Sequence, residues 1–409
     1  MNEAMLEKYA RLVVKTGINI QKGQTIVITS PLECAFFVRI AAQIAYQEGA
    51  RDVVVNWRDE LLTKIRFIHA PEEVFDEFPQ WQKELYLSNA LEGAAFLYIS
   101  ASDPELMKDV NPDRMTRSQK AGNIALKEYR ERTMSNKNAW AVVSIPTKSW
   151  AKKVFPGLIE EEAVDRLWEA ILKTVRVDAP DPVAAWEEHK QNLKKKLNYL
   201  NSAGLKFLRY KNALGTDLEI EFSENHIWLG GSDYTPEGLE FIANMPTEEV
   251  FTLPLRTGVN GTVVSSMPLN YNGNLIEHFS LTFKDGKVVE VQAGKDQELF
   301  KRILDSDEGA NFLGEVALVP YDSPISRSGI LYYNTLFDEN ASCHLALGEA
   351  YPVCIKNGEN LSRDELSRLG VNNSLIHEDF MIGTPDLEIM GITRAGKEVP
   401  VFRKGNFAF

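Results

Sequence analysis

Acidic residues in apolar surroundings are the first features of this sequence that could carry out chemistry. Glu248 and Glu249 stand together just before an apolar run, 250–255. A carboxylate is rarely buried unless something positive pairs with it, and a bound metal ion is one such partner. Glu315 interrupts another apolar, strand-like run, 312–319. The alternative interpretations are a solvated turn for the pair and a water-facing edge strand for Glu315.

Histidines supply a second kind of metal ligand in the same half of the chain. His377 and Asp379 are two residues apart, so in a strand both side chains would point to the same side and could reach one ion. Imidazole and carboxylate are ordinary ligands of zinc and its neighbours. The stretch 338–351 is predicted to be a helix with an acidic first turn, which would place His344 and Tyr351 on one face.

Three acids and two histidines within one half of the chain are the kind of set that a dinuclear metal centre needs. Two divalent ions about 3.5–4 Å apart would favour a bridging carboxylate and would lower the pKa of a shared water. They could also polarise a carbonyl oxygen, so the predicted chemistry is metal-dependent hydrolysis of an amide or ester. A His-Glu-x-x-His motif is absent, which argues against a gluzincin-type protease.

The other basic residues are expected to have ordinary roles. The lysine-rich stretch 190–196 could bind an anion, but a solvated helix face is the favoured interpretation. Arg256 could bind a substrate carboxylate, but an ion pair with Glu248 or another acid is preferred. Packing or solvent-exposed positions are expected for the four remaining histidines, with His189 solvated in a charged helix: His69, His189, His226 and His278.

Length and charge limit the class of protein. A chain of 409 residues favours two domains. The net charge of −13 argues against nucleic acid as a partner. No apolar run approaches the roughly 20 residues of a membrane span, and the first fifteen residues lack a signal-peptide pattern. The three scattered cysteines favour a reducing compartment, so a cytoplasmic location is expected.

The pattern of elements changes along the chain. Short β-branched runs alternate with helical patterns in the first half, which predicts an N-terminal α/β domain with a mostly parallel sheet: 24–29, 52–57, 94–100 and 140–145. A Pro- and Asp-rich break at 177–182 is the candidate linker between domains 1–180 and 181–409. Strand-like runs then predict a β-rich α+β C-terminal catalytic domain: 206–212, 217–222, 262–267, 276–284 and 287–292.

Taken together, these motifs resemble a known family. The stretches 244–251, 314–319 and 338–348 are followed by Tyr351 and then by a His-x-Asp sequence. In this order they resemble the thermophilic-type metallo-aminopeptidases, the relatives of aminopeptidases T and S and bacterial aminopeptidase II. The resemblance covers most of the C-terminal half, and the Gln-Lys-Gly-Gln start at 21–24 is similar too.

The resemblance implies a metal site, a substrate and an assembly. It implies two divalent ions per subunit, drawn from zinc, cobalt or magnesium, and short peptide substrates with a free N-terminus. It also implies a homodimer with its active sites in an internal cavity. The family's tyrosine beside the metals corresponds to Tyr351. The implied metal ligands are Glu249, Glu315, His344, His377 and Asp379.

The mechanism that the resemblance implies is attack by a metal-bridging water on the first peptide carbonyl. The free amine of the substrate would dock at the metal site, Glu315 would take the proton, and Tyr351 would hydrogen-bond the oxyanion. Glu248 is expected beside the ligands or facing solvent, without binding metal. Two alternatives stay open: a metal-dependent esterase or amidase, and a non-catalytic protein that binds a small ligand.

Overall fold

The first half of the computed structural model, which describes residues 2–271, 274–294 and 296–409, is an α/β unit. Its four-stranded parallel sheet has the order β2-β1-β3-β4. This pairing confirms the predicted parallel sheet. The central strand β1 is rich in β-branched residues and is buried on both faces. The strands are β1 (Thr25–Pro31), β2 (Asp52–Arg58), β3 (Ala95–Ser100) and β4 (Trp140–Ser144).

Helices cover both faces of this sheet. Successive side chains along a strand point to opposite faces, so apolar residues on both faces need a partner. Ile26 and Ile28 pack in one cluster with residues of α1, α2 and α8, whereas Val27 packs in another with Tyr86 of α4 and Tyr129 of α6. The helices are α1 (Glu3–Leu12), α2 (Ala35–Gln47), α3 (Glu60–His69), α4 (Gln80–Leu91), α5 (Pro112–Ala125), α6 (Lys127–Met134), α7 (Lys148–Val154) and α8 (Glu160–Thr174).

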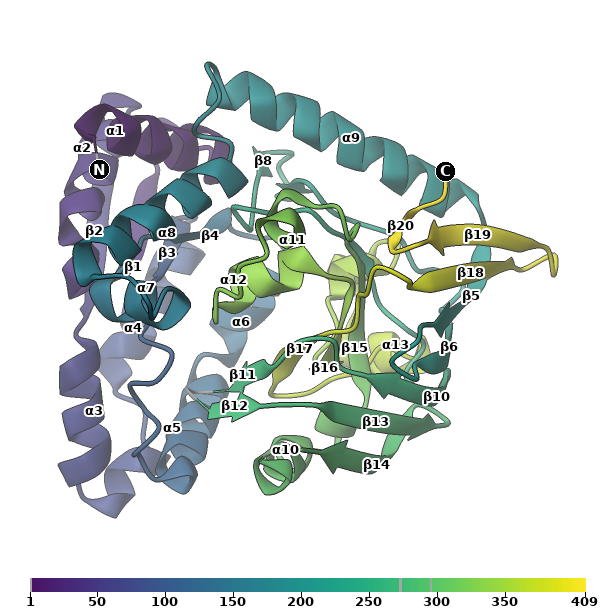
Figure 1. The fold of residues 1–409 in the computed structure, drawn as a ribbon. Helices are drawn as coiled ribbons and strands as arrows, with labels where there is room; N and C mark the ends of the chain where they lie inside the picture. The colour runs from purple at the N-terminus through teal and green to yellow at the C-terminus, as the bar shows by residue number, and fades with distance from the viewer. Residues whose placement is uncertain (1, 272–273, 295) are drawn as a thin grey trace.

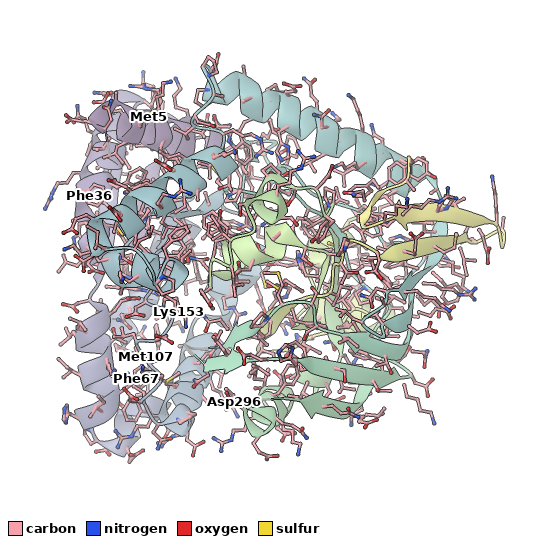
Figure 2. The ribbon with its side chains drawn as sticks, viewed as in Figure 1. Met5, Phe36, Phe67, Met107, Lys153 and Asp296 are labelled. Carbon is pink, nitrogen blue, oxygen red and sulfur yellow. The ribbon has the colours of Figure 1, made fainter. Side chains whose placement is uncertain are left out.

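The long helix α9 (Pro182–Ser202) leads from the first half of the chain along the top of the second (Figure 1). It begins at the last residue of the predicted break: Asp181 is its N-cap, and its carboxylate accepts a hydrogen bond from the Ala184 amide at 3.1 Å. Lys153, labelled in Figure 2 between the two halves, lies over the Tyr333 ring of the second half at 4.7 Å.

The second half is built on a large antiparallel sheet of order β14-β13-β10-β6-β5-β18-β19-β20. The turn at 284–287 joins β13 to β14, with positive φ at Asp285 and Gly286, which suits a two-residue hairpin. The strands are β5 (Leu205–Lys211), β6 (Asp217–Glu221), β10 (Val259–Val264), β13 (Phe279–Lys284), β14 (Lys287–Ala293), β18 (Glu388–Thr393), β19 (Glu398–Arg403) and β20 (Asn406–Phe407).

Smaller elements complete the second half. The predicted strand 276–284 is interrupted at 277–278, between β12 and β13, where His278 has a positive φ of 51°. The short strands of the second half are β7 (Asp233–Tyr234), β8 (Glu240–Phe241), β11 (Leu269–Tyr271) and β12 (Asn274–Ile276). Its short helices are α10 (Gln297–Leu304), α11 (Pro324–Ser328), α12 (Thr335–Asp338) and α13 (Arg363–Arg368).

A second antiparallel sheet, of order β17-β16-β15-β9, lies against the large one. Apolar residues that alternate along its strands, such as Val316, Leu345 and Phe380, join the core of the large sheet. The opposite face is therefore left for other side chains. The strands are β9 (Val250–Thr252), β15 (Leu313–Leu318), β16 (His344–Gly348) and β17 (His377–Met381).

The helix predicted over 338–351 is wrong. The helical part stops in a 3-10 turn at Glu339–Ala341, and the chain then runs as strand β16 from His344 to Gly348. Leu345 and Leu347, two residues apart, are both buried against the large sheet, so a period of two prevails over a helical one. His344 and Tyr351 therefore do not share a helix face.

Candidate metal centre

Five side chains converge on one small volume, four from strands of the second sheet and one, Glu249, from the position just before β9. Two groups of ligand atoms form there, each with all its atoms within 4.8 Å of one another. Glu249, Glu315 and His344 make the first group, and Glu315, His377 and Asp379 make the second. Glu315 belongs to both groups. All five residues of the implied ligand set are thus brought together.

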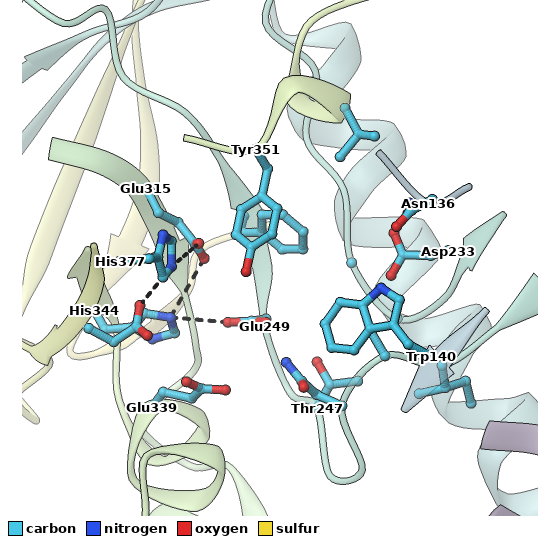
Figure 3. Close-up of a pocket in the computed structure, with 18 residues that line it drawn as sticks. Asn136, Trp140, Asp233, Thr247, Glu249, Glu315, Glu339, His344, Tyr351 and His377 are labelled. Carbon is cyan, nitrogen blue, oxygen red and sulfur yellow. Dashed lines mark hydrogen bonds and ion pairs between the residues drawn. The ribbon is translucent and has the colours of Figure 1, made fainter. Parts of the chain in front are cut away.

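The short distances in the cluster follow this arrangement (Figure 3). Nε2 of His344 lies 3.1 Å from Oε2 of Glu249 and 3.8 Å from Oε1 of Glu315. Nε2 of His377 lies 3.3 Å from Oε2 of Glu315 and 3.5 Å from Oδ1 of Asp379. Each imidazole therefore faces two carboxylates, and Glu315 offers one oxygen to each ring.

Strand register explains why these residues meet. Ala346 of β16 is opposite both Glu315 of β15 and Asp379 of β17, while Gly348 is opposite His377. The small residues of β16 leave room for the larger side chains on either side. Since β15 lies between β16 and β9, Glu315 is not on an edge strand and is only 5 % exposed. The water-facing alternative for Glu315 is wrong.

Backbone carbonyls orient both imidazole rings. Nδ1 of His344 lies 3.1 Å from the Ser342 carbonyl, and Nδ1 of His377 lies 2.7 Å from the Glu349 carbonyl. A carbonyl oxygen only accepts, so each Nδ1 carries the donated proton. In the neutral imidazole, Nε2 then presents its lone pair to the carboxylate cluster, which is the tautomer that a metal ligand requires.

The electrostatics of the cluster suit a cation. Oε2 of Glu249 makes no hydrogen bond with any described residue, although it is buried. Burial raises the pKa of Glu249, whereas at Glu315 the two imidazoles outweigh burial and lower the pKa to about 2. Burial alone would lower the pKa of His344, but the adjacent carboxylates raise it well above its usual value. Nitrogen and oxygen donors of this kind fit zinc, cobalt and related divalent ions.

Tyr351 stands beside the cluster. Its ring lies 5.1 Å from the His377 ring in an edge-on arrangement, and Figure 3 shows its hydroxyl directed into the pocket. Burial raises the pKa of this phenol, so the group stays protonated and can donate a hydrogen bond. The 3-10 turn at Pro352–Cys354 begins directly after Tyr351 and holds it there.

The pocket also has walls that sequence reasoning missed. A cavity of about 70 Å³ is lined by the cluster, by Glu339, and by Asn136, Trp140 and Asp233 on the far side. Asn136 and Trp140 come from the first half of the chain, so both halves form the cavity. Glu339 looked like the solvated start of a helix, and no pattern in the sequence distinguished it. Its burial is a property of the folded chain alone.

Glu248 lies outside both ligand groups and is paired elsewhere. Its carboxylate accepts a hydrogen bond from Nη2 of Arg176 at 2.6 Å. His189, predicted to be solvated, is instead 11 % exposed and donates from Nε2 to the Thr247 carbonyl at 2.7 Å. That prediction is wrong because α9 packs its His189 side against the loop that carries Glu249.

The lysine and arginine predictions have mixed outcomes. Lys190 was assigned to a solvated helix face, yet it is only 15 % exposed and pairs with Glu187 at 2.8 Å and with Glu240 at 3.0 Å. The face of α9 that Lys190 occupies is therefore partly covered. Arg256 pairs with Glu308 at 2.9 Å, so an acid is its partner as preferred.

Fold and site together define a metal-dependent hydrolase, and comparisons with known proteins narrow the class. The family model described as thermophilic metalloprotease (M29) matches residues 2–407. Aminopeptidase 2 of Geobacillus stearothermophilus is 52 % identical over 407 residues, covering 100 % of this chain and 98 % of that protein. Aminopeptidase T of Thermus thermophilus is 43 % identical over 402 residues, covering 98 % of each.

A solved structure agrees with these matches. Wild-type AmpT from Thermus thermophilus superposes with a TM-score of 0.92 at 41 % identity, covering 100 % of both chains. The chain belongs to the thermophilic metalloprotease (M29) family. It is a metallo-aminopeptidase, and the predicted fold class of an α/β half followed by a strand-rich half is confirmed.

Proposed function

We propose that this metallo-aminopeptidase releases N-terminal residues from short peptides and holds two divalent ions in its second sheet. The observation that carries the proposal is the sharing of Glu315 between two ligand groups. The proposed ligands are Glu249, Glu315, His344, His377 and Asp379. Ions bound there would lower the pKa of a water and polarise the scissile carbonyl.

Residues of the chain have separate proposed roles around the scissile carbonyl. Glu315, the carboxylate shared by the two ligand groups, takes the proton of the attacking water and relays it to the nitrogen of the leaving amine. The protonated hydroxyl of Tyr351 donates a hydrogen bond to the oxygen that becomes negative in the transition state. The burial of the site strengthens both interactions, since local screening by water is weak there.

Hydrolysis of a panel of aminoacyl-p-nitroanilides before and after dialysis against EDTA tests this function. Activity should disappear with the chelator and return when zinc, cobalt or magnesium is added back. Activity that is indifferent to EDTA, or absent with every ion, would contradict the proposal. Equal hydrolysis of an Nα-acetylated substrate would favour an esterase or amidase instead.

A homodimer is the proposed assembly. Helix α3 has no buried residue, and four of its apolar side chains are 45–66 % exposed: Leu61, Leu62, Ile65 and Ile68. Trp57, at the end of β2, is 42 % exposed and precedes the helix closely in the chain. An exposed apolar surface of this kind is typical of a contact between subunits.

A boundary between domains near residue 180 and a cytoplasmic location are proposed as well. The boundary is supported by the break that separates α8 from α9. The location is supported by three free, buried cysteines, which fit a reducing compartment. Within the described chain, every helix is too short or too polar to span a bilayer.

A further inference from the structure

Glu339 is a buried acid that the proposed reaction does not use. It begins the 3-10 turn after α12 and is 8 % exposed. Among the described residues, its carboxylate accepts one hydrogen bond, from Nδ2 of the adjacent Asn340 at 3.3 Å, and forms no ion pair with lysine, arginine or histidine. A buried carboxylate without a cation is costly, so its position calls for an explanation.

The carboxylate of Glu339 is directed toward the metal cluster. Figure 3 shows it beside His344 and Glu249, on the side of the pocket that holds the ligands. It lines both the 70 Å³ cavity and an adjoining cavity of about 550 Å³. The fold thus holds a buried carboxylate without a cationic partner among the described residues at the wall of the cavity, where a cationic group of a ligand would be favourable.

Asn340 fixes the turn that carries Glu339. Its Oδ1 accepts a hydrogen bond from the Glu248 amide at 2.7 Å, and its Nδ2 donates to the Leu336 carbonyl at 2.9 Å. The first bond ties the turn to the residue immediately before Glu249. The position of Glu339 is therefore set relative to the cluster, as substrate recognition requires.

Glu339 is not one of the grouped ligand residues. Among the described residues, both groups with ligand atoms within 4.8 Å are complete without it. It lies close enough to influence them electrostatically while its carboxylate faces the cavity. A group so placed can contact a substrate atom next to the scissile carbonyl.

We infer that Glu339 binds the α-ammonium group of the substrate, an inference that rests on the proposed aminopeptidase function. In a peptide, the terminal nitrogen and the first carbonyl carbon are two bonds apart, about 2.5 Å. A carbonyl at the cluster therefore places the ammonium in the same cavity. A charge-assisted hydrogen bond to Glu339 neutralises both groups and makes a free N-terminus a requirement.

Asp233 is the alternative anchor that the cavity offers. Its carboxylate accepts a hydrogen bond from Nδ2 of Asn136 at 3.0 Å. In Figure 3 both residues lie across the pocket from His344 and Glu315, above Trp140 in this view. Asp233 already has a hydrogen-bond partner and belongs to neither ligand group. Asp233→Asn therefore serves as the matched control.

The test compares two substrates that differ at one group. L-leucyl-p-nitroanilide carries the amine, and 2-hydroxyisocaproyl-p-nitroanilide carries a hydroxyl in its place. Glu339→Gln should lower kcat/KM for the amine roughly 10- to 100-fold and leave the hydroxyl compound nearly unchanged. Asp233→Asn should leave the ratio of kcat/KM for the amine to kcat/KM for the hydroxyl compound as it is in the wild type. Metal content, measured by mass spectrometry, should equal that of the wild type in both variants.

The inference would be overturned if Glu339→Gln lowered kcat/KM equally for both substrates, or if that variant lost its metal. It would also be overturned if Asp233→Asn, and not Glu339→Gln, removed the preference for the amine substrate. Glu339→Asp, which keeps the charge, should retain part of the amine preference. If both Glu339 variants fail to fold, the residue is structural and the inference fails.

A binding measurement separates this inference from the proposed function. Calorimetry on the metal-loaded protein would compare the aminophosphonate analogue of leucine with its desamino counterpart. The wild type should prefer the amine, and Glu339→Gln should lose that preference. Wild-type protein that hydrolyses neither anilide contradicts the proposed function, whereas an unchanged amine preference in Glu339→Gln contradicts only the role of Glu339.

Discussion

Two backbone carbonyls determine how the candidate metal centre presents its nitrogen ligands. His344 and His377 each direct Nδ1 to a carbonyl, so both rings offer Nε2 to the carboxylates. The orientation of both rings is therefore set by backbone at the two ends of β16, with Ser342 before the strand and Glu349 after it.

Tyr351→Phe should separate catalysis from metal binding. We expect kcat to fall by roughly 100-fold, because the variant lacks one hydrogen bond to the developing oxyanion. Metal content should not change. Steady-state kinetics and mass spectrometry check both expectations. Tyr234→Phe, at an exposed tyrosine, is the control and should behave as wild type; loss of metal from Tyr351→Phe would contradict the assigned role.

The adjacent acids should respond differently to the same substitution. Glu249→Gln should lose bound metal and activity while the protein stays folded, since it removes a proposed ligand. Glu248→Gln should keep its metal and unfold at a lower temperature, since Arg176 is left without its charged partner. Metal analysis and thermal unfolding of both variants test this contrast. Loss of metal from Glu248→Gln and not from Glu249→Gln would show that Glu248 is the metal ligand and Glu249 is not.

At the scale of elements, a buried ion pair joins the segment after α8 to the loop that carries Glu249. Arg176 joins Glu248 at 2.6 Å, with side chains 18 % and 6 % exposed. Arg176→Met should lower the free energy of unfolding by about 3–5 kcal/mol, because Glu248 stays buried and unpaired. Denaturant unfolding measures this. Arg209→Met, at an exposed pair with Glu219, should cost no more than about 1 kcal/mol.

Strand β16 depends on a glycine. Gly348 has a φ of +103°, and a Cβ there would lie 2.2 Å from the Ile376 carbonyl oxygen. Gly348→Ala should therefore destabilise the protein by more than about 2 kcal/mol, combining a strained backbone with a clash. Gly396→Ala, at a positive φ with open space around it, should cost only about 1–2 kcal/mol. Equal losses in unfolding experiments would contradict this.

The elements also explain what could and could not be predicted from the sequence. The parallel sheet was predictable because its β-branched runs are bounded by clear helices. His377 and Asp379 were predicted to share one side of a strand, and they do so in β17. The stretch 338–351 was not predictable, because its small residues show no strong period and its burial depends on the large sheet. Glu339 was overlooked for the same reason.

At the scale of the whole molecule, bound metal should contribute to stability. The cluster holds three carboxylates close together, and a cation bound only by the folded state shifts the equilibrium toward folding. Dialysis against EDTA should lower Tm by several degrees, and added zinc or cobalt should restore it. Differential scanning calorimetry checks this. A Tm that is the same with and without metal would contradict the proposed site.

The order of the ligands along the chain has a consequence for biosynthesis. Glu249 and Glu315 leave the ribosome well before His377 and Asp379, and the parallel sheet that supplies Trp140 is made first of all. A nascent chain can therefore present at most a partial, weak site while the N-terminal half is already folding. With the proposed ligand set, metal loading would be completed only after translation, and protein made under metal limitation should accumulate as a folded, inactive pool that added ions can activate.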